Sequence, residues 1–85
     1  MKLATSERFS EAVVAELKKI RTAKGISQKT LAEAAGLTRG AVTHIEARIR
    51  NPSLVVCHAL ASALGISLST VLRRVERAWD SSSSK

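Results

Sequence analysis

Eighty-five residues suffice for one small domain, but not for a second core or for a catalytic cleft between two lobes. Apolar residues make up 45% of the chain and the aromatic residues are Phe9 and Trp79, so the core must be aliphatic. Fourteen Lys and Arg against seven Asp and Glu give a formal net charge of +7. This excess favours a polyanionic partner such as nucleic acid over a basic one.

Several classes of site are excluded by the cysteine, the histidines and the short apolar runs. Cys57 is the single cysteine, so it cannot form an intramolecular disulfide, and with His44 and His58 it offers no zinc-ligand spacing. No apolar run reaches the length of a signal peptide or a membrane span. We therefore expect a cytoplasmic protein with no membrane association, no metal and no other cofactor. Cys57 is interpreted as a small core residue and His58 as an exposed one.

The first predicted helix spans residues 6–24. Its apolar residues recur every three or four positions, which places them on one side of a helix about five turns long. Gly25 is expected to end it. The residues predicted to face the core are Phe9, Val13, Leu17 and Ile20.

Two short helices are predicted next, at 28–35 and 39–46. Ser27 and Thr38 are of the residue types that cap helix N-termini, and each directly precedes one of these segments. Gly36 lies between the two helices, where the chain must turn. The residues predicted to face inward are Leu31, Ala32, Ala35, Val42 and Ile45.

The second half of the chain predicts two more helices. Pro52 and Ser53 introduce the fourth, and Ser67 or Ser69 caps the fifth, which extends to about Trp79. The inward residues of the fourth helix are predicted to be Leu54, Cys57, Leu60, Ala61 and Leu64.

The predicted organisation is therefore one all-α domain at residues 6–79, followed by a tail at 80–85. The tail contains four consecutive serines, which have no apolar side chain to bury, so we expect it to be disordered.

Residues 28–47 meet the structural requirements of a helix-turn-helix. Two helices that cross closely need a small residue at their contact, which Ala32 supplies, and a turn residue that tolerates positive φ, which Gly36 supplies. The outer side of the second of these helices is polar or small, which leaves it available to a ligand. The space beneath the crossing is expected to be filled by Leu31, Leu37, Val42 and Ile45.

Three stretches of the chain carry a family resemblance: LKKIRTAKGISQKTLAEAAG, TRGAVTHIE, and NPS followed by ALASALGIS. Over about residues 9 to 72 the chain resembles the phage-repressor-like (XRE, Cro/CI-like) helix-turn-helix domains, which include restriction-modification controllers, small repressors and antitoxins. The resemblance implies a compact five-helix domain, encoded by a bacterium or a phage, that binds operator DNA as a homodimer. Its third helix would enter the major groove.

The resemblance also assigns the residues that would read DNA bases. They lie on the side of the third helix that the apolar pattern leaves facing outward. Arg39 can donate two hydrogen bonds to O6 and N7 of guanine. Relatives often carry a polar base-reading side chain at Gly40, so one contact is expected to be missing here. The predicted base contacts are Thr38, Arg39, Gly40, Thr43 and His44.

The resemblance implies that Gln28, at the start of the second helix, binds a phosphate and braces the third helix. Free backbone N–H groups at the starts of the second and fourth helices, and the loop before the fourth, are further predicted phosphate contacts. Between residues 18 and 50 the chain has eight basic and two acidic residues, so most of the net charge lies in this part. The predicted contacts are Gln28, Lys29, Arg21, Arg48, Arg50, Asn51 and Ser53. The resemblance further makes Arg21 and Glu46 a partly buried ion pair that joins the first helix to the end of the third.

The fifth helix has more apolar residues than a short core needs. We therefore predict that it packs within the monomer and also forms a dimer interface that sets the two reading helices about 34 Å apart. The predicted interface residues are Ile66, Leu68, Val71, Leu72, Val75 and Trp79.

The leading hypothesis is a sequence-specific DNA-binding regulator of transcription that acts as a homodimer on a pseudo-palindromic operator. One alternative is an antitoxin of a toxin-antitoxin pair that regulates its own operon. A second is a protein-interaction module that uses the helix-turn-helix as a scaffold. Contacts with a toxin or with RNA polymerase stay open, and no residue is assigned to catalysis, because no Ser, His and acidic side chains are paired in a cleft.

Overall fold

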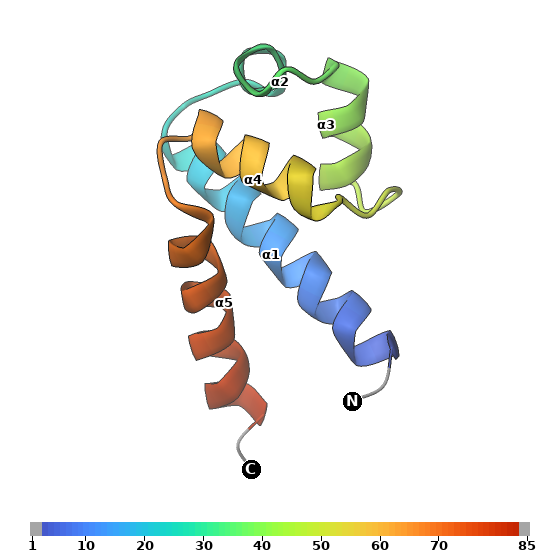
Figure 1. Ribbon diagram of the computed structural model, residues 1–85, viewed down its shortest axis with the longest axis vertical. Coiled ribbons are helices and arrows are strands. Elements are labelled where there is room, and N and C mark those ends of the chain that lie inside the picture. The colour runs from blue at the N-terminus through green and yellow to red at the C-terminus, as the bar shows by residue number, and fades with distance from the viewer. Residues whose placement is uncertain (1–2, 84–85) are drawn as a thin grey trace.

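Residues 3–83, the part of the chain that the computed structural model describes, form five helices and no strand (Figure 1). The predicted all-α five-helix fold is therefore confirmed. The helices are α1 (Leu3–Ala23), α2 (Gln28–Ala35), α3 (Arg39–Glu46), α4 (Leu54–Ala63) and α5 (Leu68–Ser83).

The two outer helices are longer than the sequence predicts. Helix α1 begins at Leu3, three residues before the predicted start, and the backbone of α5 continues to Ser83, beyond the predicted end near Trp79. Each residue added to an existing helix gains a backbone hydrogen bond, and serine costs only a fraction of a kcal/mol relative to alanine there. The predicted disordered tail at 80–85 is thus corrected for residues 80–83, and residues 84–85 lie outside the described part.

Side-chain caps start four of the helices. The hydroxyls of Ser27, Thr38 and Ser53 accept hydrogen bonds from backbone N–H groups in the first turns of α2, α3 and α4. Ser67 does the same for α5 by accepting from the N–H of Thr70 at 3.2 Å, so Ser67 is the cap of this helix. Each cap satisfies a backbone donor that has no partner within the helix.

The core lies where α1, α4 and α5 pack together beneath the α2–α3 pair. The N-terminal end of α1 and the C-terminal end of α5 lie together at one end of the molecule, and α2 and α3 lie at the other (Figure 1). Phe9 and Trp79 meet edge to face near the first end, with ring centroids 5.5 Å apart. The core cluster consists of Val13, Leu17, Ile20, Leu31, Ala32, Val42, Leu60, Ala61, Leu64, Val71 and Val75.

Two predictions about apolar residues are wrong. Val71 and Val75 are buried inside the monomer, at 0% and 5% exposure, so they cannot line a dimer interface as predicted. Leu54 was predicted to face the core but is 73% exposed. Cys57 is half-buried, and burial raises the pKa of its thiol, which suits a packing residue better than a reactive one.

Among residues 3–83 no single helix has both the length and the apolar composition of a membrane span. Helices α4 and α5 reach these only when they are taken together across a 106° bend.

Substitution of Leu64 by alanine should lower the free energy of unfolding by about 3 kcal/mol, because Leu64 is fully buried and its loss leaves a cavity. Urea denaturation followed by circular dichroism measures this change. The matched control is Ile49→Ala, since Ile49 is 73% exposed and its loss should cost under about 0.5 kcal/mol. Equal losses for the two variants would contradict the assigned core.

Candidate nucleic-acid interface

A tight turn orients α2 and α3. Gly36 adopts the left-handed conformation at φ 75°, where a side chain would be strained, and the N–H of Leu37 donates back to the Ala32 carbonyl at 2.8 Å. Ala32 is 1% exposed, as expected of the small residue that lets two helices approach closely. The structure therefore has the turn that the sequence predicts for a helix-turn-helix.

Helix α3 has one anchored side and one exposed side. Val42 and Ile45 are buried at 1% and 2% exposure and hold the helix against the core. The opposite side consists of the five residues that the sequence assigns to base contacts, all of which are exposed: Thr38, Arg39, Gly40, Thr43 and His44.

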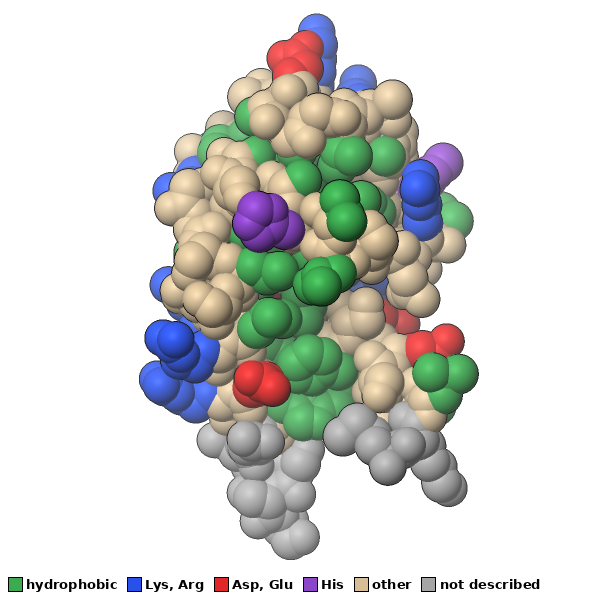
Figure 2. Space-filling view, in the orientation of Figure 1, with side chains coloured by type: hydrophobic (Ala, Val, Ile, Leu, Met, Phe, Trp, Pro, Cys, Tyr) green, Lys and Arg blue, Asp and Glu red, His purple; other side chains and the backbone are tan. Residues whose placement is uncertain are grey.

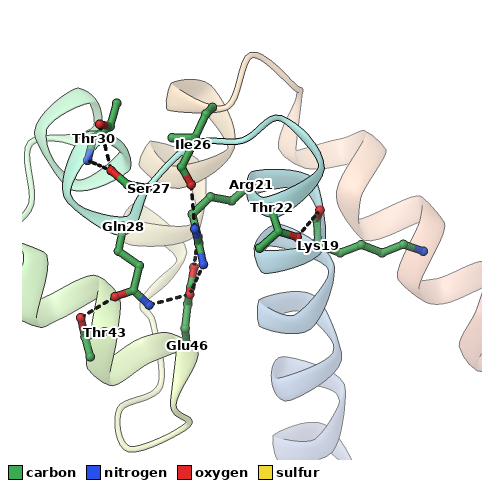
Figure 3. Close-up of polar contacts among 9 residues, drawn as sticks. All are labelled: Lys19, Arg21, Thr22, Ile26, Ser27, Gln28, Thr30, Thr43 and Glu46. Carbon is green, nitrogen blue, oxygen red and sulfur yellow. Dashed lines mark hydrogen bonds and ion pairs between the residues drawn. The ribbon is translucent and has the colours of Figure 1, made fainter.

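A bidentate ion pair fixes the C-terminal end of α3 to α1 (Figure 3). Arg21 donates from Nε to Glu46 Oε2 at 2.8 Å and from Nη2 to Glu46 Oε1 at 3.0 Å. Its Nη1 donates to the carbonyl of Ile26 at 2.7 Å, which holds the chain between α1 and α2. The side chains of Arg21 and Glu46 are 11% and 8% exposed, so the structure contains the partly buried pair that the resemblance implies.

Gln28 extends this pair to the exposed side of α3 (Figure 3). Its Nε2 donates to Glu46 Oε1 at 2.8 Å, and its Oε1 accepts from the hydroxyl of Thr43 at 2.8 Å. The four side chains form one hydrogen-bonded network across α1, α2 and α3, defined here as the Glu46 network: Arg21, Gln28, Thr43 and Glu46.

Comparison with known proteins places this geometry in a family. The family model described as "Helix-turn-helix" matches residues 17–71. The chain belongs to this helix-turn-helix family. The match spans α2 and α3 together with the segments that anchor them. No curated protein sequence matches the chain.

Several solved structures of gene regulators are similar to this chain. The restriction-modification controller protein C.AhdI from Aeromonas hydrophila is 42% identical, with a TM-score of 0.67 over 73% of this chain and 94% of that chain. A variant of the controller protein C.Esp1396I is 28% identical, with a TM-score of 0.77 over 81% and 90%. The clp gene regulator ClgR from Corynebacterium glutamicum is 28% identical, with a TM-score of 0.74 over 82% and 74%. The helix-turn-helix protein is a DNA-binding transcriptional regulator.

The helix-turn-helix protein keeps most of its predicted phosphate contacts at the surface. Lys29, Arg48, Arg50 and Asn51 are exposed, and so is Ser53, whose hydroxyl also caps α4. Arg48 stands at φ 64° in the loop after α3. The N–H groups of the next two residues both donate to the carbonyl of His44, which ties the loop to the end of α3.

Arg21 is the exception among these residues. Its Nε, Nη1 and Nη2 atoms all donate within the protein, and its side chain is nearly buried. The prediction that Arg21 contacts phosphate is therefore corrected, and its role is to hold α3. Gln28 braces α3 as the resemblance implies, through its bonds to Glu46 and Thr43. The sequence does not predict Thr43 as its partner, because these residues are fifteen positions apart and only the helix crossing brings them together.

Glu46 is held in its charged form. Burial opposes its charge and would raise the pKa, but hydrogen bonds from Arg21 and Gln28, with the nearby positive charges of Arg21 and Lys18, lower the pKa below its ordinary value. A lowered pKa in the folded state stabilises the protein above the ordinary glutamate pKa. That contribution is lost as the pH falls through the folded-state value.

Arg21→Ala should lower the free energy of unfolding at pH 7 by about 3 kcal/mol, because it leaves the nearly buried Glu46 carboxylate without its partner. Urea denaturation at a series of pH values from 7 downward measures this, and the difference from the unsubstituted protein should shrink as the pH falls through the lowered pKa of Glu46. Arg74→Ala is the control, since Arg74 is exposed and its 3.5 Å contact with Glu16 should contribute under about 1 kcal/mol. A pH-independent effect of Arg21→Ala would contradict the assigned network.

Proposed function

We propose that this regulator binds a pseudo-palindromic operator as a homodimer, with α3 of each copy in a major groove. The observation that supports this best is the two-sided character of α3, whose apolar side is fixed in the core while its polar side is exposed. A helix of this kind can enter the major groove, where each base pair presents a distinct pattern of donors and acceptors.

Arg39 is proposed as the principal base-reading residue. It lies at the first position of α3 and is exposed, so its guanidinium can reach out from the N-terminal end of the helix. The planar fork of donors matches O6 and N7 of guanine, and such a bidentate pair contributes about 1–3 kcal/mol of discrimination. His44, on the same exposed side, is proposed to contact a base edge, and Thr38 and Gly40 to lie against the DNA.

Phosphate contacts are proposed to flank α3. Lys29 at the start of α2, with Arg48, Arg50 and Asn51 in the loop before α4, would bind the backbone on its two sides. An amide carries two N–H donors, and Glu46 takes one from Gln28, which leaves the second for a phosphate. Ser53 and the N-terminus of α4 would add a further contact.

The dimer surface is proposed at the start of α4 rather than along the whole of α5. Leu54 and Val55 are 73% and 78% exposed, and with His58 and Leu68 they line an open apolar hollow of about 390 Å³. Figure 2 shows hydrophobic side chains gathered over α4 and between α5 and α1. An exposed apolar area on a small basic protein is expected at a subunit contact, which we define as the α4 patch: Leu54, Val55, His58 and Leu68.

The solved relatives support the regulatory part of the proposal. Two are named controller proteins of restriction-modification systems and one a regulator of a clp gene. We propose that this chain likewise acts at a promoter, in the cytoplasm, and without catalytic activity of its own.

Selection of bound sequences from a random duplex pool tests the DNA-binding proposal. The unsubstituted protein should enrich DNA with two half-sites related by two-fold symmetry. Arg39→Ala should lose the preference for guanine at one position of each half-site. Arg50→Ala, the matched control, should weaken binding to all DNA sequences alike. It should also reduce the slope of log affinity against log salt by about 0.9, as expected for one lost phosphate contact. Failure to enrich any sequence, with an affinity independent of salt, would contradict the proposal.

Leu54→Asp should convert the dimer into a monomer, because it buries a charge in the apolar contact. Sedimentation equilibrium measures the change, and the dimer dissociation constant should rise by at least about 100-fold, in line with the cost of an unpaired interfacial charge. Ile49→Asp introduces the same charge at an equally exposed apolar residue outside the α4 patch and should leave the dimer intact. The assignment fails if both variants dissociate equally.

A further inference from the structure

The Glu46 network contains a fixed order of donors and acceptors. Glu46 is ionised at neutral pH, because the bonds from Arg21 and Gln28 lower its pKa. An ionised carboxylate has no hydrogen to donate and can only accept. The atom of Gln28 that faces Glu46 Oε1 at 2.8 Å must therefore be the amide nitrogen.

This order continues to the exposed side of α3. Because Nε2 of Gln28 faces Glu46, its Oε1 faces Thr43, as the 2.8 Å contact with the Thr43 hydroxyl shows (Figure 3). An amide oxygen has no hydrogen, so the hydroxyl must donate. A threonine hydroxyl has one hydrogen and two acceptor lone pairs, and its single hydrogen is used inside the protein.

A threonine without such a partner rotates its hydroxyl to suit the group that it meets. It could then donate to the keto oxygen of guanine or thymine, or accept from the amino group of adenine or cytosine. In this protein the Thr43 hydroxyl can donate to a keto oxygen only if its bond to Gln28 breaks. The bond is exposed in the protein alone, so its loss is costly only where DNA covers α3; there, breaking it would leave the Gln28 oxygen without a partner and away from water, which opposes donation to a keto oxygen.

We propose that Thr43 recognises a base that presents an amino group in the major groove, adenine or cytosine, and that Gln28 is the positioning residue that imposes this choice. The proposal rests on the proposed function, since it requires α3 to lie in the major groove. It complements Arg39, which has donors only and therefore selects acceptors such as those of guanine. Neighbouring steps of the half-site would thus be read by opposite hydrogen-bonding patterns from residues one helical turn apart.

The test is selection from a random duplex pool with the unsubstituted protein, three variants and one control variant. The unsubstituted protein should favour adenine or cytosine over guanine or thymine at one position of each half-site. The expected preference is about 2- to 10-fold, the range expected of one neutral hydrogen bond. Thr43→Val removes the hydroxyl and should abolish that preference, while the guanine preference that depends on Arg39 should be retained. Thr43→Ser keeps the hydroxyl and should restore it.

The third variant, Gln28→Met, tests the positioning role. It frees the Thr43 hydroxyl, so the same position should accept all four bases although Thr43 itself is unchanged. Lys29→Met is the matched control, because it removes a neighbouring α2 side chain and should lower affinity for all sequences without changing any base preference. Thermal unfolding by circular dichroism confirms that each variant is folded before selection.

Two results would overturn this inference by itself. One is a selection that shows the guanine preference due to Arg39 but no position at which Thr43→Val removes a preference for adenine or cytosine. The other is an unchanged base profile in Gln28→Met. If the unsubstituted protein enriches nothing, the proposed function fails, and this inference fails with it.

Discussion

The placement of α3 depends on one carboxylate. Glu46 receives two hydrogen bonds from Arg21 on α1 and one from Gln28 on α2, so three helices meet at a single side chain. A helix of eight residues has little stability alone, and its position must come from tertiary contacts. Val42 and Ile45 supply the apolar part of this anchorage and Glu46 the directional part. The position of the exposed side of α3 is therefore set by both kinds of contact on its buried side.

Local features of the fold could be predicted from the sequence because their causes are local. Ser27 and Thr38 cap α2 and α3 as predicted, since a cap needs only a short polar side chain and the following turn. The stripe on α1 and the turn at Gly36 are likewise set by spacing and residue type. These features determine the helix-turn-helix, so all five residues predicted to face a ligand are found exposed.

Features that depend on which side of a helix meets another helix could not be predicted. Helix α4, with the sequence LVVCHALASA, is apolar on nearly every side, so periodicity cannot distinguish exposed Leu54 from buried Leu60. Helix α5 has a clear stripe, but the same stripe suits a core or a subunit contact, and packing against α1 assigns Val71 and Val75 to the core. The hydrogen bond from Thr43 to Gln28 needs a crossing angle that no local pattern specifies.

Arg48 carries a conformational cost that this protein retains. At φ 64° it occupies a backbone region that disfavours side chains by roughly 1–2 kcal/mol, and a glycine would sit there without penalty. The loop after α3 instead keeps a cation at this point. With the phosphate contact proposed for Arg48, stability and DNA affinity are opposed at this single residue: selection for a more heat-resistant protein would favour replacing it, and selection for tighter DNA binding would favour keeping its charge.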